Sequence, residues 1–320
     1  MSGRVITIIL VLILVGGLAW FINRNYIEPE SNAGMTTPGI SSKNLESSDN
    51  LLYTVTGAAH EIWLVNPTGK TEKIFTDADE QEKIVKFSNV AQNSREVLAV
   101  TASNKLISIN LDKGKIATLK NSFSRPDLII VSAQGDEFAY IRFSNVDENY
   151  GYTLYLESRA GQNRRALAQS DTEIRSLSFN RDSTEIAYAK TSGTGAEINI
   201  VKVDTKEIIN IAKFNNKLID SLAWAGNSIY FNLRDIGANS GEIDKIDANG
   251  KKETNSQATL TDYNGGIANF IAGSSTKIAF LVAQYSDKIN DSTSGQIYIT
   301  DIANGQRQPL KKGIQILGWL

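Results

Sequence analysis

The sequence predicts an all-β fold: a six-bladed β-propeller that is closed by strands from both of its ends and preceded by one N-terminal transmembrane helix. Three observations lead to this expectation. A unit of short apolar strands and polar turns recurs six times after residue 50, at a spacing of about 45 residues that is typical of propeller blades. The first unit lacks an opening strand, and the last segment lacks a second strand. An uncharged apolar run precedes the repeats.

Each unit is expected to supply four short strands, of which three are readily recognised. The first strands are rich in β-branched residues, as expected of strands packed near a central axis, and the third strands alternate between apolar and polar residues. The first strands are expected at 84–87, 128–131, 174–179, 219–224, 267–271 and 314–319. The second strands contain the pairs Leu52-Tyr53, Leu98-Ala99, Ala139-Tyr140, Ala187-Tyr188, Tyr230-Phe231 and Ala279-Phe280. The third strands are expected at 62–65, 106–109, 154–156, 198–201, 243–246 and 297–299.

The two ends of this repeat region fit together. The segment Ile314–Leu320 matches the first strand of a blade, whereas the unit at Leu51 opens with a second strand. Joining them completes the sixth blade, so residues 51–320 are expected to form one closed ring. No sustained 3.6-residue apolar stripe occurs beyond Tyr26, so helix content should be very low.

The N-terminal segment predicts a membrane anchor. Val5 to Ile22 is an uncharged run of 18 residues, roughly 27 Å long as a helix, which approximately spans a hydrocarbon core. A cleaved signal peptide is the alternative, but its apolar region would usually be shorter, and Gly17-Leu18-Ala19 is only a fair cleavage site.

The anchor divides the rest of the N-terminal region. Residues 1–4 would form a short cytoplasmic tail, and residues 23–50, mainly Ser, Thr, Asn, Gly and Pro, a flexible linker. The charge of Arg4 and of the terminal amine favours a cytoplasmic N-terminus. We therefore expect a single-pass protein of the cell membrane with an extracytoplasmic propeller.

The composition excludes several classes of function. Basic and acidic residues number 33 and 35, giving a net charge of −2, and they are well mixed along the chain. A nucleic-acid partner is not expected, because such proteins normally carry a basic stripe with aromatic residues among it. The absence of cysteine excludes disulfides, thiol catalysis and thiolate metal sites.

Three segments carry a resemblance to a known family. Residues 179–188 (FNRDSTEIAY), 131–140 (VSAQGDEFAY) and 274–280 (SSTKIAF) resemble the repeat of TolB-like six-bladed propellers, in which a Ser-Pro-Asp-Gly turn precedes Ile-Ala-Tyr or Ile-Ala-Phe. The turn proline is missing in all three, Ser183 replaces the glycine and Gln134 the aspartate. The resemblance covers residues 51–320. It implies the fold more than the role, because such propellers serve as envelope binding proteins, peptidase gating domains and sensor domains.

The connections between second and third strands are expected to be long loops in four blades, at 142–152, 190–197, 234–242 and 284–296, and to emerge on one face. Long loops on a rigid scaffold are where binding usually occurs, so a partner is expected on that face. Tyrosines there would offer a large contact area with a polar tip. The candidate contact residues are Tyr150, Tyr152, Tyr285, Asp147 and Asp287.

No catalytic residue or cofactor is expected. His60 is the only histidine, and no Gly-x-Ser-x-Gly motif occurs. The polar run 145–151 has oxygen-bearing residues at alternate positions but lacks the final Glu of a calcium loop. The sequence thus favours a non-catalytic scaffold or binding module for a protein or peptide of the cell envelope, with a cell-wall glycan as the second partner class. The alternative is an envelope hydrolase or lyase that uses acidic residues near the axis, because the separation of carboxylates across a ring is not visible in a sequence.

Overall fold

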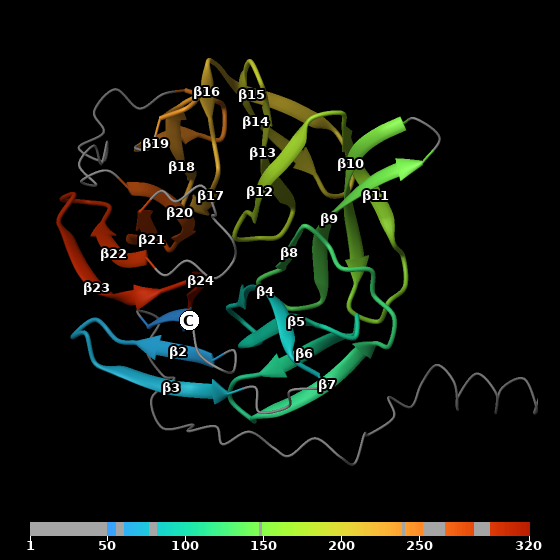
Figure 1. Ribbon diagram of the computed structural model, residues 1–320, viewed down its shortest axis with the longest axis vertical. Helices are drawn as coiled ribbons and strands as arrows, with labels where there is room; N and C mark the ends of the chain where they lie inside the picture. The colour runs from blue at the N-terminus through green and yellow to red at the C-terminus, as the bar shows by residue number, and fades with distance from the viewer. Residues whose placement is uncertain are drawn as a thin grey trace, which may run out of the picture. The chain divides into compact units, whose positions relative to one another are not determined.

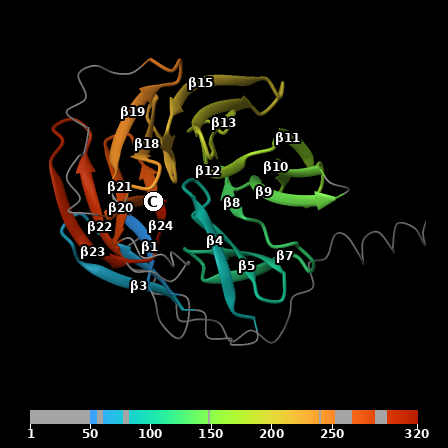
Figure 2. The same cartoon turned by 45° about the horizontal axis from the view of Figure 1, so that its top comes forward.

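The computed structural model describes residues 50–55, 61–76, 82–146, 149–238, 241–251, 266–284 and 295–320. These residues form six antiparallel sheets arranged in a ring, as Figure 1 and the tilted view in Figure 2 show. The innermost strands β24, β4, β8, β12, β17 and β20 pack against one another in a closed cycle. This confirms the predicted six-bladed propeller.

Four sheets follow the chain order from the innermost strand outwards. The first contains β4 (Ile84–Ala91), β5 (Glu96–Thr101), β6 (Leu106–Asn110) and β7 (Lys115–Lys120). The second contains β8 (Leu128–Val131), β9 (Glu137–Val146), β10 (Asn149–Ser158) and β11 (Arg165–Ser170). The third contains β12 (Glu173–Phe179), β13 (Glu185–Ser192), β14 (Gly195–Lys202) and β15 (Ile208–Asn215). A further sheet contains β20 (Gly266–Gly273), β21 (Lys277–Gln284), β22 (Gly295–Asp301) and β23 (Arg307–Gly313).

The remaining two sheets depart from this pattern. In one, the inner position is divided between β16 (Lys217–Leu218) and β17 (Leu222–Ala225), which both pair with β18 (Ser228–Asp235), and β19 (Glu242–Asp247) lies outside β18. The other is the closing sheet, in which β24 (Gln315–Trp319) pairs with β1 (Leu51–Val55), followed by β2 (Glu61–Val65) and β3 (Thr71–Thr76). The pairing of Tyr53 with Ile316 confirms that the two ends of the repeat region share one blade.

The hydrophobic core lies between neighbouring sheets. The buried residues that the structure describes form six clusters, and each cluster joins one adjacent pair of sheets. Small residues in the second strands allow the sheets to approach closely, since Ala139, Ala187 and Ala279 are fully buried. Burial of apolar surface on both faces of each sheet therefore stabilises the ring as a whole.

Side chains of the inner strands also bind the backbone of the next blade. The Ser176 Oγ accepts a hydrogen bond from the Leu222 N–H at 2.9 Å, and the Ser221 Oγ accepts one from the Ile271 N–H at 2.9 Å. Asn89 binds the N–H of Val131 in the same way at 2.7 Å. Buried backbone groups that would lack a partner at the inner edge are satisfied by these contacts.

Two turn residues have a left-handed backbone conformation. Ser183, which replaces the expected glycine, has a φ of +59°. Gly250 has a φ of +79°, and a Cβ there would lie 2.0 Å from the Ile211 carbonyl oxygen, so only glycine fits.

Several sequence predictions fall outside the described residues. These are the tail at 1–4, the transmembrane anchor Val5–Ile22, the linker at 23–50 apart from Asn50, and His60. Among the residues that the structure does describe, no helix is long and apolar enough to cross a membrane.

Candidate functional site

The hairpin formed by β9 and β10 extends beyond its own sheet. The two strands pair with each other from Glu137 and Ser158 up to Val146 and Asn149. In the part of the chain that the structure describes, β8 pairs with β9 only as far as Ile141, and β11 pairs with β10 only as far as Tyr152. The end of the hairpin is thus a two-stranded ribbon, which Figure 1 shows projecting from the ring between the labels β10 and β11.

This ribbon carries an aromatic pair at its base. Phe143 and Tyr152 are direct cross-strand partners, and their ring centroids are 5.0 Å apart. Phe143 is 46% exposed, the largest exposed fraction, together with Ile208, among the large apolar side chains described. Tyr152 is half-buried and packs against the core cluster between the β8 and β12 sheets. An exposed ring supported by a fixed neighbour is typical of a contact residue.

Two carboxylates lie close to this aromatic pair. The Asp127 Oδ2, at the start of β8, accepts a hydrogen bond from the Phe143 N–H at 3.1 Å. Burial raises the pKa of Tyr152, and the negative charges of Glu173 and Asp127 raise it further, whereas Arg175 opposes them. Two of the three charged groups that act on the Tyr152 hydroxyl are thus carboxylates.

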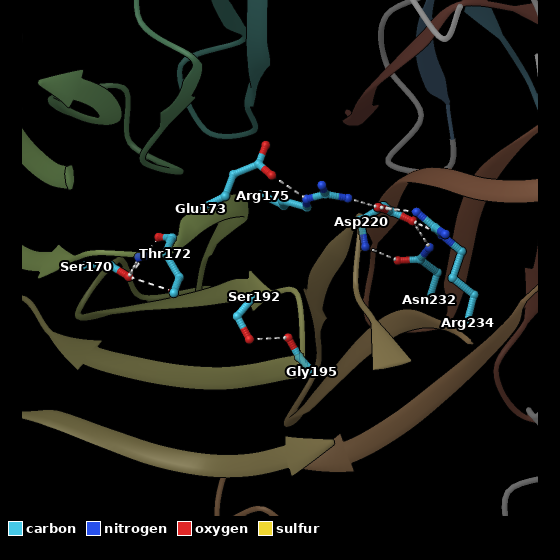
Figure 3. A network of polar contacts seen from close by, with 9 residues as sticks. All are labelled: Ser170, Thr172, Glu173, Arg175, Ser192, Gly195, Asp220, Asn232 and Arg234. Atoms are coloured by element: carbon cyan, nitrogen blue, oxygen red, sulfur yellow. Dashed lines mark hydrogen bonds and ion pairs between the residues drawn. The ribbon is translucent and has the colours of Figure 1, made fainter. Parts of the chain in front are cut away.

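A chain of ion pairs continues from Glu173 into the next sheet (Figure 3). The Arg175 Nε donates to Glu173 Oε2 at 2.8 Å, and its Nη1 donates to Asp220 Oδ1 at 2.7 Å. Arg234 contacts both oxygens of Asp220, through Nε at 2.6 Å and Nη2 at 3.2 Å. Asn232 adds a contact of 3.3 Å to the same carboxylate. Strands β12 and β18 are thereby linked through a single aspartate.

The interruption between β16 and β17 positions this aspartate. The backbone N–H groups of Asp220 and Ser221 both donate to the Asn232 Oδ1 at 2.8 Å, which fixes the segment that separates the two strands. Burial alone would raise the pKa of the Asp220 carboxyl, but the hydrogen bonds and positive charges of Arg234 and Arg175 outweigh it and lower the pKa. Asp220 is therefore a charged anchor for two arginines.

The structure corrects the prediction of long loops in two blades. Residues 142–146 and 149–152 lie in paired strands, and 190–197 form a tight hairpin in which Ser192 pairs with Gly195. Both hairpins keep the backbone hydrogen bonds of a strand pair, and that outweighs the low β-propensity of their polar residues.

The structure describes only some of the residues that were predicted to contact a partner. Tyr152 lies in β10, half-buried, instead of on a loop. Tyr150 also lies in β10, and only its backbone is described. Asp147, Tyr285 and Asp287 lie outside the described residues.

Sequence reasoning did not single out Phe143, Glu173, Arg175, Asp220 or Arg234. One signal was available for two of them: Arg175 and Asp220 are 45 residues apart, about one repeat, with Arg175 near the start of β12 and Asp220 two residues before β17. The described residues contain no group of three or more His, Cys, Asp or Glu that could hold a metal ion.

Comparison with known proteins identifies the fold. No protein-family model matches the sequence, and no curated protein matches it. Among solved structures, TolB from Agrobacterium tumefaciens superposes with a TM-score of 0.61 at 14% identity, covering 83% of this chain and 93% of that chain. A chain of the nidogen/laminin complex gives a TM-score of 0.58 at 11% identity, covering 84% and 96%.

Enzymes are also among the structural neighbours. An oligogalacturonate lyase in complex with manganese gives a TM-score of 0.53 at 9% identity, covering 82% of this chain and 73% of that chain. At such low identities the likeness concerns the fold alone. The chain thus has the fold of a six-bladed β-propeller, and its structural neighbours include propellers of the TolB type.

Proposed function

We propose that the chain is a non-catalytic binding or scaffold module of the cell envelope, anchored by residues 5–22 with its propeller outside the cytoplasmic membrane. Its partner would be a protein or peptide that contacts the face bearing the β9–β10 hairpin. The observation that carries this proposal is the projection of that hairpin beyond both neighbouring strands, with Phe143 exposed at its base. Exposed aromatic residues on a rigid support are typical anchors of protein interfaces.

Site-specific photo-crosslinking tests the binding face. A photoreactive amino acid at position 143 of the full-length chain, in membranes of the native host, should give a discrete crosslinked product with another protein. The matched control places the same amino acid at Lys113, an exposed residue in the turn between β6 and β7. This turn joins a third strand to a fourth strand and so lies at the opposite end of the strands from the β9–β10 turn. Crosslinking at position 113 alone would show that the wrong face was chosen.

The orientation in the membrane needs a separate experiment. A reporter that is active only after export, fused behind Leu320, should be active, and protease added to spheroplasts should remove the propeller. An inactive reporter and a protected propeller would place the partner in the cytoplasm instead.

The enzymatic alternative depends on acidic residues near the axis. Glu173 in β12 and Asp220 in the segment between β16 and β17 are engaged by arginines, which suits a structural role better than general acid or base catalysis. Incubation of the purified chain with oligogalacturonate should yield no unsaturated product, with and without added manganese. Product formation would favour the lyase function.

A further inference from the structure

The projecting hairpin has an open edge on the side of β8. The Phe143 N–H points to this edge, because it donates to Asp127 there. Backbone groups alternate in direction along an antiparallel strand, so the carbonyl of Phe143 and both backbone groups of Asn145 point the same way. Among the described residues no strand pairs with this edge beyond Ile141. Such an edge is a template for another strand.

The side chains at the base of the edge favour a particular kind of strand. Phe143 exposes an apolar ring next to the open backbone groups. Asp127 is exposed and uses one carboxylate oxygen to bind the Phe143 N–H, and the side chain of Glu173 is 46% exposed and binds Arg175 through one oxygen. A partner strand with an apolar residue opposite Phe143 would place a basic neighbour near these carboxylates.

We propose that an extended segment of the partner protein, carrying a lysine or arginine near an apolar residue, adds to the free edge of β9 in line with β8. This inference rests on the proposed binding function and specifies its mode. Backbone hydrogen bonds to the Phe143 carbonyl and to both backbone groups of Asn145 would supply the alignment. The Phe143 ring would supply an apolar contact, and Asp127 and Glu173 the preference for a basic residue. The same two carboxylates act on the nearby Tyr152 hydroxyl, which places them on the side of the hairpin that carries the aromatic pair.

Short synthetic peptides provide the probe. The first is an N-acetylated, C-amidated peptide of alternating valine and threonine that contains one phenylalanine and, two places away, one lysine. The second has glutamine instead of the lysine, and the third carries N-methyl groups on alternate amides so that it cannot pair along one edge. Binding of each fluorescent peptide to the full-length chain in lipid nanodiscs is measured by anisotropy.

The lysine peptide should bind about tenfold more tightly than the N-methylated one, because the latter loses the backbone hydrogen bonds. It should bind roughly two- to fivefold more tightly than the glutamine peptide, the range expected of an exposed ion pair. Phe143→Ala should weaken binding about tenfold or more. Asn145→Pro removes one N–H from the open edge, and the pairing within the hairpin does not use this N–H. The variant should therefore bind the lysine peptide no more tightly than the N-methylated peptide.

Variants of the two carboxylates separate the contribution of charge from that of the backbone hydrogen bonds. Asp127→Asn combined with Glu173→Gln keeps an acceptor for Phe143 and for Arg175, and should remove only the preference for lysine over glutamine. Asp182→Asn, an exposed residue in the turn between β12 and β13, serves as the control and should change nothing.

Two results would overturn the inference. If the N-methylated peptide bound as tightly as the lysine peptide, strand addition would be excluded. If the double variant still preferred lysine over glutamine, Asp127 and Glu173 would be excluded as the source of that preference. If position 143 still crosslinks to a partner in membranes, the proposed function stands and only the strand mode is wrong. If no crosslink forms at 143 and no peptide binds, both are wrong.

Discussion

The N–H of Leu320 donates a hydrogen bond of 2.9 Å to the carbonyl oxygen of Asn50. The first described residue is thus tied directly to the last. Between them β24 supplies the innermost strand of the closing sheet, and its side chains Ile316, Leu317 and Trp319 are buried in the clusters on either side. The closing sheet consequently depends on residues from both ends of the repeat region.

Deletion of residues 314–320 should unfold the propeller. Each of the buried side chains Ile316, Leu317 and Trp319 contributes roughly 1.5–3 kcal/mol, and the sum is comparable with the whole stability of a typical domain. Urea unfolding of a fragment that starts at Asn50, followed by circular dichroism, measures the effect. The control replaces the exposed Lys312 by glutamine. A truncated fragment with an unchanged urea midpoint would contradict closure by β24.

Asp220→Asn should destabilise the protein by about 3 kcal/mol, the lower end of the range for breaking a buried ion pair, because the Arg175 partner is partly exposed. Glu173→Gln removes a more exposed pair and should cost less than about 1 kcal/mol. Denaturant titrations of the two variants give both values. Equal losses would mean that Asp220 is not the anchor of the network.

The same aspartate makes stability dependent on pH. Because the pKa of folded Asp220 lies below its unfolded value, its contribution is complete above the unfolded pKa of about 4 and is lost as the pH falls through the folded pKa. The wild type should therefore lose more stability than Asp220→Asn between about pH 5 and pH 2. If the difference in stability between the wild type and Asp220→Asn stayed constant with pH, the lowered pKa of Asp220 would be contradicted.

Three buried tyrosines should resist ionisation. Burial raises the pKa of Tyr53 and Tyr188 to about 12, and burial followed by the charge of Glu157 raises that of Tyr140 to about 12. Since the folded pKa exceeds the unfolded value of about 10, their contribution to stability is present below about pH 10 and is lost as the pH rises towards 12. Tyrosinate absorbance should show these groups titrating together with alkaline unfolding. Their ionisation near pH 10 in a folded protein would refute the prediction.

Substitutions of Phe143 and Tyr152 should have different effects on partner binding and on stability. Tyr152→Ala removes a half-buried ring from a core cluster and should cost about 2 kcal/mol, roughly half of the loss for a fully buried aromatic ring. Phe143→Ala should cost less than about 1 kcal/mol because about half of this residue is exposed, while it weakens partner binding. Thermal denaturation measures the effect on stability, and the anisotropy of the fluorescent lysine peptide measures the effect on binding. Tyr152→Phe is the control and should leave stability nearly unchanged.

The fold could be predicted from the sequence because each blade repeats the same apolar alternation, and a register slip would turn every buried residue outwards. The β9–β10 hairpin was harder, since Ser144, Asn145 and Asn149 have low β-propensity and pair only across the hairpin, with Gly151, Tyr150 and Val146. The ion-pair chain was not predictable, because it joins residues from two sheets, and a sequence does not show which charged side chains meet. Arg175 and Arg234 converge on Asp220 only once the two neighbouring sheets have packed together.

The pairing of β1 with β24 also has a consequence for biosynthesis. Leu51 is translated early, yet its inner partner Trp319 emerges from the ribosome only after all the other described strands. Until then β1 exposes an unpaired edge, and the core clusters on both sides of the closing sheet lack the side chains of β24. Contacts of such large sequence separation form slowly and leave the nascent chain prone to aggregation. Closure of the ring is therefore the last step in the folding of the described strands, and molecular chaperones that protect exposed strand edges should act on this chain before β24 is released from the ribosome.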